Sequence, residues 1–251
     1  MAAGHLSLRS GNPVLKADTF TRDVDRAGDN VMTISGTVNK TALALIILVA
    51  AGSWTWKQGM DGSSSSGLMM VGGIGGFVVA MITVFKRTWA PFTTPLYAAL
   101  EGLFLGGISV MFERSYPGIV SQAVFLTFGT LGALLLAYRS GLIKATENFK
   151  LGVAAATGGI FFLYMLSFVL GFFGISIPLI HSNGLFGILF SGFVVVIAAL
   201  NLVLDFDFIE EGAERGAPKY MEWYATFGLL VTLIWLYLSI LRLLAKLQSR
   251  N

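Results

Sequence analysis

The sequence predicts an all-α membrane protein that crosses the bilayer seven times. Apolar residues make up 55% of the 251 residues, charged residues make up only 12%, and the apolar residues fall in long uncharged runs. Soluble domains carry roughly 25% charged residues. A run of about 20 apolar residues can cross the hydrocarbon core as a helix, whose backbone groups hydrogen-bond to one another.

The first 38 residues are polar and precede the first apolar run. Acidic and basic residues are mixed in this segment without an apolar stretch before a cleavage site, so it does not resemble a signal peptide. We expect a cytoplasmic tail over residues 1–38 and a seven-helix transmembrane domain over residues 39–251. The net charge of +3 suits loops that face anionic lipid, and we expect no nucleic-acid partner.

Seven apolar segments follow the tail, each close to the length that spans a bilayer. Their ranges are 41–57, 67–85, 92–112, 119–138, 152–173, 185–205 and 223–244. Tryptophan and tyrosine gather near the ends of these segments, as in the aromatic belt of a membrane interface. Close packing of the second and third segments is favoured by glycines at four-residue spacing, which are Gly72, Gly76, Gly102 and Gly106.

The distribution of basic residues predicts the orientation. Most of the 17 lysines and arginines share one side of the membrane if the N-terminus is cytoplasmic. The positive-inside rule therefore favours a cytoplasmic N-terminus and an external C-terminus. Arg242, Lys246 and Arg250 count against the external C-terminus, and they suit a last helix that does not cross fully.

Two polar residues of the sixth span mark the candidate site. Asp205 ends a span that has no other charge from Leu185 onward, and Asn201 lies one helical turn before it on the same face. Carboxylates inside a membrane are costly and usually serve ions, protons or a partner charge. We therefore expect Asp205 and Asn201 to belong to an ion pathway or a pH sensor, and Asp207 to be a cap or interfacial charge.

Other charged residues fall in the same half of the predicted bundle. Glu101 lies well inside the third span, Glu222 starts the seventh, and Arg87 follows the second. Simpler explanations stay open for each of them. Glu101 can form a structural hydrogen bond, Glu222 is favourable at a helix start through the helix dipole, and Arg87 can anchor the span at the interface.

The last span carries a polar stripe on one face, on which Thr232 and Ser239 follow Glu222. Such a stripe either packs against a neighbouring helix or lines a narrow wet path. Serine and threonine hydroxyls in membrane helices also commonly bond to their own backbone carbonyls. Thr226 lies off the stripe, and we expect no role for it.

Enzyme chemistry has little support in the sequence. There are no cysteines and only two histidines, His5 and His181, whereas catalytic zinc needs about three protein ligands in one place. No HExxH, phosphate-binding loop or serine triad occurs, so we expect no enzyme, no resident metal and no cofactor. Oxygen ligands suit calcium, and a buried carboxylate beside a cation can exchange a proton near neutral pH. Calcium and protons are therefore the candidate transported ions.

Four stretches resemble one known family. They are Met32-Thr-Ile-Ser-Gly-Thr-Val-Asn39-Lys40-Thr41, Leu96-Tyr97-Ala-Ala-Leu-Glu101-Gly102, Asn201-Leu-Val-Leu-Asp205-Phe-Asp207, and Glu222-Trp223-Tyr224 with Leu236-Tyr237-Leu238. Together they look like the bacterial Bax inhibitor-1-like family, from about residue 12 onward. The resemblance implies six helices around a central C-terminal helix, a pH-sensitive calcium leak and a bacterial inner membrane. Eukaryotic members are linked to suppression of cell death, and a bacterial relative to a membrane-bound protease.

The resemblance also implies a gate of two aspartates, from the sixth and seventh helices, with a basic counter-charge near the second. Asp205 resembles the first aspartate, and Arg87 matches the counter-charge. The second aspartate has no match, because its place lies nearer Thr232, with Ser239 one heptad further on. Glu222 or Glu101 would have to supply the missing acid.

Two functions from different classes stay open. The first is an ion pathway, a leak or an exchanger, for calcium or protons. The second is a non-conducting regulator in the lipid bilayer that binds another membrane protein, such as a membrane-bound protease, through its tail and helix faces.

Overall fold

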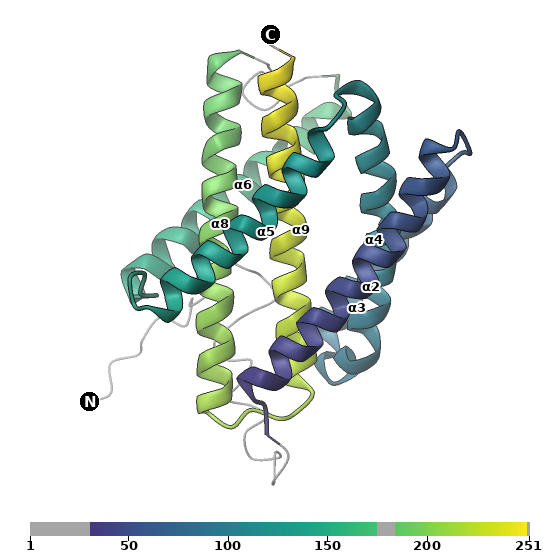
Figure 1. Ribbon diagram of the computed structural model, residues 1–251. Coiled ribbons are helices and arrows are strands. Elements are labelled where there is room, and N and C mark those ends of the chain that lie inside the picture. The colour runs from purple at the N-terminus through teal and green to yellow at the C-terminus, as the bar shows by residue number, and fades with distance from the viewer. Residues whose placement is uncertain (1–30, 175–183, 250–251) are drawn as a thin grey trace. The chain divides into compact units, whose positions relative to one another are not determined.

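The computed structural model describes residues 31–174 and 184–249. Figure 1 shows its helices, which are α2 (Ile34–Met60), α3 (Ser66–Phe85), the short η2 (Arg87–Trp89), α4 (Ala90–Ser115), α5 (Ile119–Arg139), α6 (Glu147–Gly171), α8 (Leu185–Glu214) and α9 (Met221–Gln248). Seven helices in these two ranges are long and apolar enough to cross a membrane, and the ranges contain no strand. The predicted fold class is confirmed, and the arrangement of six helices around the last stays a prediction.

Two helices extend well beyond the apolar runs that predicted them. α2 begins at Ile34 rather than at residue 41, and α8 continues to Glu214 rather than ending near residue 205. Glutamate and alanine are good helix formers, and an ion pair between Arg215 and Glu211, one turn apart, stabilises the end of α8. The sequence also predicts a polar turn over residues 210–219, and this prediction is wrong for residues 210–214, which are helical.

The described residues form two compact parts, and α8 and α9 each belong to both. The first, here called the α2–α4 part, holds residues 31–120 and 208–231. Within it α2 and α3 pack against α4 (Figure 1). A Cβ added to Gly102 would collide with the carbonyl oxygen of Leu48, and one added to Gly106 with that of Gly52. These two glycines of the third span therefore pack against the first span, α2. The expected close packing of the second and third spans is confirmed at Gly72 of α3, where an added Cβ would lie 2.5 Å from the carbonyl oxygen of Leu100 on α4.

The second part, here called the α5–α6 part, holds residues 121–174, 184–207 and 232–249. Its apolar core includes Ile160 of α6 with Val194 and Ile197 of α8, and Trp235 of α9 packs against them. The core brings α6 alongside α8, which positions the polar residues near the end of α8.

Large apolar side chains are exposed along many of the helices. Examples are Ile46, Phe77, Phe125, Phe162 and Phe186. Soluble monomers rarely expose apolar patches of this extent. The exposed side chains are those that a lipid bilayer would cover, which agrees with the seven membrane-spanning helices.

Candidate functional site

Asp205 and Asn201 lie on α8 in the α5–α6 part, and both are buried, with 0% and 1% of their surfaces exposed. The Asn201 Nδ2 group donates to Thr157 Oγ1 on α6 and to the carbonyl oxygen of Ile197, both at 2.8 Å. Because a carbonyl can only accept, these bonds fix which way the amide points. The side chain of Asn201 therefore joins α8 to α6 through its nitrogen alone.

The amide oxygen of Asn201 takes no part in these two hydrogen bonds. Asn201 Oδ1 is buried and finds no hydrogen-bond donor within the described residues. A buried acceptor without a donor destabilises the folded state by about 1–3 kcal/mol, and such groups are rare enough in proteins to need an explanation. This oxygen lies one helical turn from the buried Asp205.

Asp207 has a partner that the sequence analysis missed. Lys150 Nζ of α6 lies 2.5 Å from Asp207 Oδ2, and the two side chains are 8% and 24% exposed. The interfacial charge expected at Asp207 is thus paired with a largely buried lysine. The sequence contained one signal for this pair, because the predicted topology places the segments before α6 and after residue 205 on the same side of the membrane.

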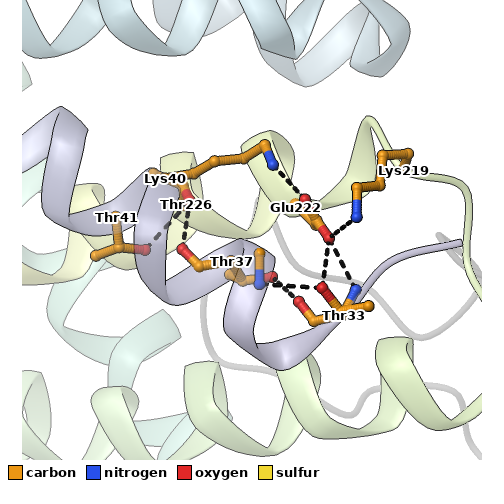
Figure 2. Close-up of polar contacts among 8 residues, drawn as sticks. Thr33, Thr37, Lys40, Thr41, Lys219, Glu222 and Thr226 are labelled. Atoms are coloured by element: carbon orange, nitrogen blue, oxygen red, sulfur yellow. Dashed lines mark hydrogen bonds and ion pairs between the residues drawn. The ribbon is translucent and has the colours of Figure 1, made fainter.

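In the α2–α4 part, Glu222 is fully buried, and its carboxylate accepts contacts from three residues (Figure 2). Thr33 donates to Glu222 Oε1 from its backbone nitrogen and its hydroxyl, both at 2.9 Å. Lys219 Nζ lies 2.9 Å from the same oxygen, and Lys40 Nζ pairs with Glu222 Oε2. Two ammonium groups therefore neutralise this carboxylate, and neither partner was predicted from the sequence.

Thr226, for which the sequence predicts no role, takes part in polar contacts in the structure. Its side chain is buried one turn after Glu222, and its hydroxyl lies 3.2 Å from that of Thr41 and 3.5 Å from the carbonyl oxygen of Thr37 (Figure 2). The face of the last span that contains Glu222, Thr232 and Ser239 passes through Ala225, three residues after Glu222, when successive steps alternate between three and four residues. A four-residue step from Glu222 would have found Thr226.

Arg87 and Glu101 also belong to the α2–α4 part. The Arg87 guanidinium carbon lies 5.7 Å from the ring centre of Tyr224, within the range of a cation–π contact. Glu101 is partly buried on α4 and faces α3, where a Cβ added to Gly76 would lie 2.6 Å from Glu101 Oε1. Asp205 belongs to the other part, so its pairing with Arg87, Glu101 or Glu222 stays a prediction.

The polar stripe of the last helix is buried along its length. Thr232 and Ser239 are both buried. Ser239 Oγ donates to the carbonyl oxygen of Trp235 at 2.8 Å, which is the backbone bond common in membrane helices. This bond accounts for Ser239 without a wet path, while a role for Thr232 in the pathway stays a prediction.

No cluster of three or more histidine, cysteine, aspartate or glutamate side chains that could hold a metal ion occurs in residues 31–174 and 184–249. His5 and His181 lie outside these ranges, as does most of the predicted tail.

Comparison with known proteins gives one match. No curated protein and no solved structure matches the sequence. A family model described as Bax inhibitor 1 like matches residues 12–249. This range contains all four stretches that carry the resemblance, and two of them, residues 32–41 and 222–224, contact each other around Glu222. The chain is therefore a multi-pass membrane protein that belongs to the Bax inhibitor 1 like family.

Proposed function

We propose that the protein is a pH-sensitive cation leak, for calcium or protons, whose ion site is formed by Asp205 and Asn201. Family membership and seven apolar helices support an integral membrane protein. The observation that carries the proposal is the buried Asn201 Oδ1, which accepts no hydrogen bond from the described residues one turn from the buried Asp205.

The chemistry of this pair suits a cation that has lost part of its water. Calcium prefers oxygen ligands at about 2.3–2.6 Å. Side chains one turn apart on a helix have Cβ atoms about 5–6 Å apart, so a carboxylate and an amide oxygen can contact one ion together. Asp205 supplies the negative charge, and Asn201 Oδ1 supplies a dipole without a competing donor. A proton or a hydronium ion can use the same two oxygens.

Four further residues complete the proposed pathway. Glu101 is a second carboxylate along it, and Glu222 is a pH-sensing group that the clasp described below would couple to the fold. The family resemblance gives Arg87 the role of basic counter-charge, and Thr232 stands where the family places its second aspartate. Following the positive-inside rule, we assign the N-terminus to the cytoplasm. Following the family resemblance, we assign the protein to a bacterial inner membrane.

Flux measurements in proteoliposomes test the proposal. Purified wild type and Asp205→Asn are reconstituted at equal density, and calcium and proton entry are followed with trapped dyes over a pH series. We expect wild type to exceed empty liposomes with a rate that depends on pH, and Asp205→Asn to fall close to the empty-liposome rate. Equal flux for the two proteins would exclude Asp205 from the pathway. Absence of flux in the wild type would favour the non-conducting regulator.

A further inference from the structure

The first turns of α2 and α9 meet in a polar seam, which Figure 2 shows. Its members are Thr33, Thr37, Lys40 and Thr41 on the α2 side with Glu222 and Thr226 on the α9 side. Thr33, Thr37 and Thr41 lie four positions apart, and Lys40 lies three positions after Thr37, so they occupy one face of the helix. The seam is held by hydrogen bonds and ion pairs, whereas α2 and α4 are held by close backbone packing at glycines.

Glu222 is the anchor of this seam. It binds the cap of α2, because Thr33 both donates to Glu222 and accepts from the backbone nitrogen of Gly36 at 3.0 Å. A negative charge at a helix N-terminus is also favoured by the helix dipole. The two lysines on Glu222 remain open to solvent, since the side chain of Lys40 is 21% exposed and that of Lys219 is 42% exposed. One buried carboxylate therefore holds the start of α2 and two solvent-accessible cations.

The residues just before α2 are bound at the same place. The backbone nitrogen of Met32 donates to the carbonyl oxygen of Ala217 at 2.6 Å, and Val31 forms an isolated antiparallel bridge with Pro218. The side chain of Met32 is 1% exposed. Residues 31–33 thus lie along the connection between α8 and α9.

Gly36 provides the space that the anchor needs. A Cβ at this position would overlap the Glu222 carboxylate, whose Cδ and two oxygens are its three nearest neighbours. Alanine is a better helix former than glycine by about 1 kcal/mol, so glycine here is explained by the carboxylate rather than by the helix. Thr33, Gly36 and Lys40 of the first family stretch all serve this one contact.

We propose that residues 31–33 form a clasp that Glu222 locks, and that the clasp opens when Glu222 loses its charge or is displaced. The physical reason is that the hydrogen bonds from Thr33 and the ion pairs with both lysines all converge on the Glu222 carboxylate. Without the carboxylate, the Thr33 cap contact and both ion pairs are lost together, and the ammonium groups of Lys40 and Lys219 are left facing each other. The clasp is a conformational switch where the polar N-terminal segment joins the helices. It does not depend on the ion site proposed at Asp205 and Asn201, because neither of these residues takes part in the clasp contacts.

Disulfide trapping tests the clasp directly, because the natural chain contains no cysteine. Val31→Cys and Pro218→Cys introduce one pair across the antiparallel bridge. Opposed residues in such a bridge have Cα atoms about 4.5–5.5 Å apart, which falls within the roughly 4.4–6.8 Å that a disulfide spans. The rate of cross-link formation with a mild oxidant is measured on the full-length protein in lipid vesicles, by the mobility shift of the cross-linked chain.

The cross-linking rate is compared in three backgrounds. We expect Glu222→Gln to slow cross-linking about tenfold or more, because removing one partner of a buried ion pair has large effects. The matched control is Glu211→Gln, which also replaces one paired carboxylate by an amide, here the partner of Arg215 at the end of α8, and we expect its rate to stay within about twofold of the parent pair. An unchanged rate in Glu222→Gln would overturn the clasp.

A second variant covers the case in which Glu222→Gln does not fold. Gly36→Ala changes no charge but places a methyl group where the carboxylate lies. Its control is Gly158→Ala in α6, whose Cβ would meet nothing within 4 Å. We expect Gly36→Ala to slow cross-linking and Gly158→Ala to leave it unchanged, and equal rates in the two would also overturn the clasp. Because the readout is a cross-link rather than ion flux, its result is independent of the proposed function.

Discussion

Asn201 of α8 is bound to Thr157 of α6 through its amide nitrogen, 2.8 Å from the threonine hydroxyl, while its amide oxygen stays buried without a donor. A residue that served packing alone would gain stability by losing that oxygen. This asymmetry separates a structural role for Asn201 from a role in ion binding, because the two roles predict opposite effects on stability and flux.

We expect Asn201→Leu to keep or raise the stability of the protein while lowering its cation flux. The substitution removes an unsatisfied acceptor that is unfavourable by about 1–3 kcal/mol, which offsets the loss of the bond to Thr157. Stability is measured by thermal unfolding in detergent, and flux in proteoliposomes.

Thr157→Val is the matched control. It removes the other end of the hydrogen bond but leaves Asn201 Oδ1 in place, and the Asn201 nitrogen keeps the Ile197 carbonyl. We expect the free energy of unfolding to fall by about 1 kcal/mol, and the cation flux to be retained. If Asn201→Leu instead lost stability and Thr157→Val lost flux, the amide would be a structural link only.

Removing one member of the ion pair between Lys150 and Asp207 should cost more stability than replacing both members with apolar residues. Asp207→Asn leaves the largely buried ammonium of Lys150 without its carboxylate. We expect destabilisation of about 3 kcal/mol, the lower end of the range for broken buried pairs because Asp207 is 24% exposed. The double variant Lys150→Met with Asp207→Leu should recover most of this loss, since an apolar pair of similar size is often as stable. Thermal unfolding of the single and double variants checks this, and a double variant less stable than Asp207→Asn would contradict it.

The extent of the helices could be predicted from the sequence wherever apolar residues alone decide it. Uncharged runs locate all seven helices, but α8 continues through the acidic residues 210–214 because helix propensity and the Arg215–Glu211 pair outweigh polarity there. Apolar periodicity contains no information about which charges at the ends of different helices will pair. The Lys150–Asp207 contact depends on helix packing, which the sequence leaves open.

Glycines in the α2–α4 contact should tolerate no added methyl group. A Cβ on Gly106 would overlap the backbone of Gly52, which cannot move aside as a flexible side chain can. We expect Gly106→Ala to destabilise the protein by about 1–3 kcal/mol, as overpacking does. Gly129→Ala in α5, whose Cβ has open space around it, should be neutral or slightly stabilising. Thermal unfolding should therefore show a loss of stability for Gly106→Ala and none for Gly129→Ala, and equal effects would mean that α2 and α4 are not packed closely.

Gly75 and Gly76 allow a test of Glu101 without changing its charge. A Cβ on Gly76 would lie 2.6 Å from Glu101 Oε1, whereas one on Gly75 would lie 3.2 Å from the flexible end of Leu100. We expect Gly76→Ala to displace the Glu101 carboxylate and to change flux in the same direction as Glu101→Gln. Gly75→Ala should leave flux near the wild-type rate, and equal flux in all three variants would remove Glu101 from the pathway.

The candidate site was predictable only in part. Asp205 and Asn201 could be found because a charge and an amide in an apolar run are conspicuous and their spacing puts them on one face. The partners of Glu222 could not, because Lys40 lies 182 residues away in the chain and the sequence assigns it to the boundary of a span. A four-residue spacing links Thr33, Thr37 and Thr41, but spacing does not say which helix such a face contacts.

The most direct test of the ion site is calcium flux measured side by side for wild type, Asp205→Asn and Glu210→Gln. Asp205 is buried and Glu210 is exposed on the same helix, so both variants remove one carboxylate from α8 but only one removes it from the proposed site. We predict flux close to the empty-liposome rate for Asp205→Asn and close to the wild-type rate for Glu210→Gln. Equal rates in the two variants, with both proteins folded, would contradict the assignment of Asp205 to the ion pathway.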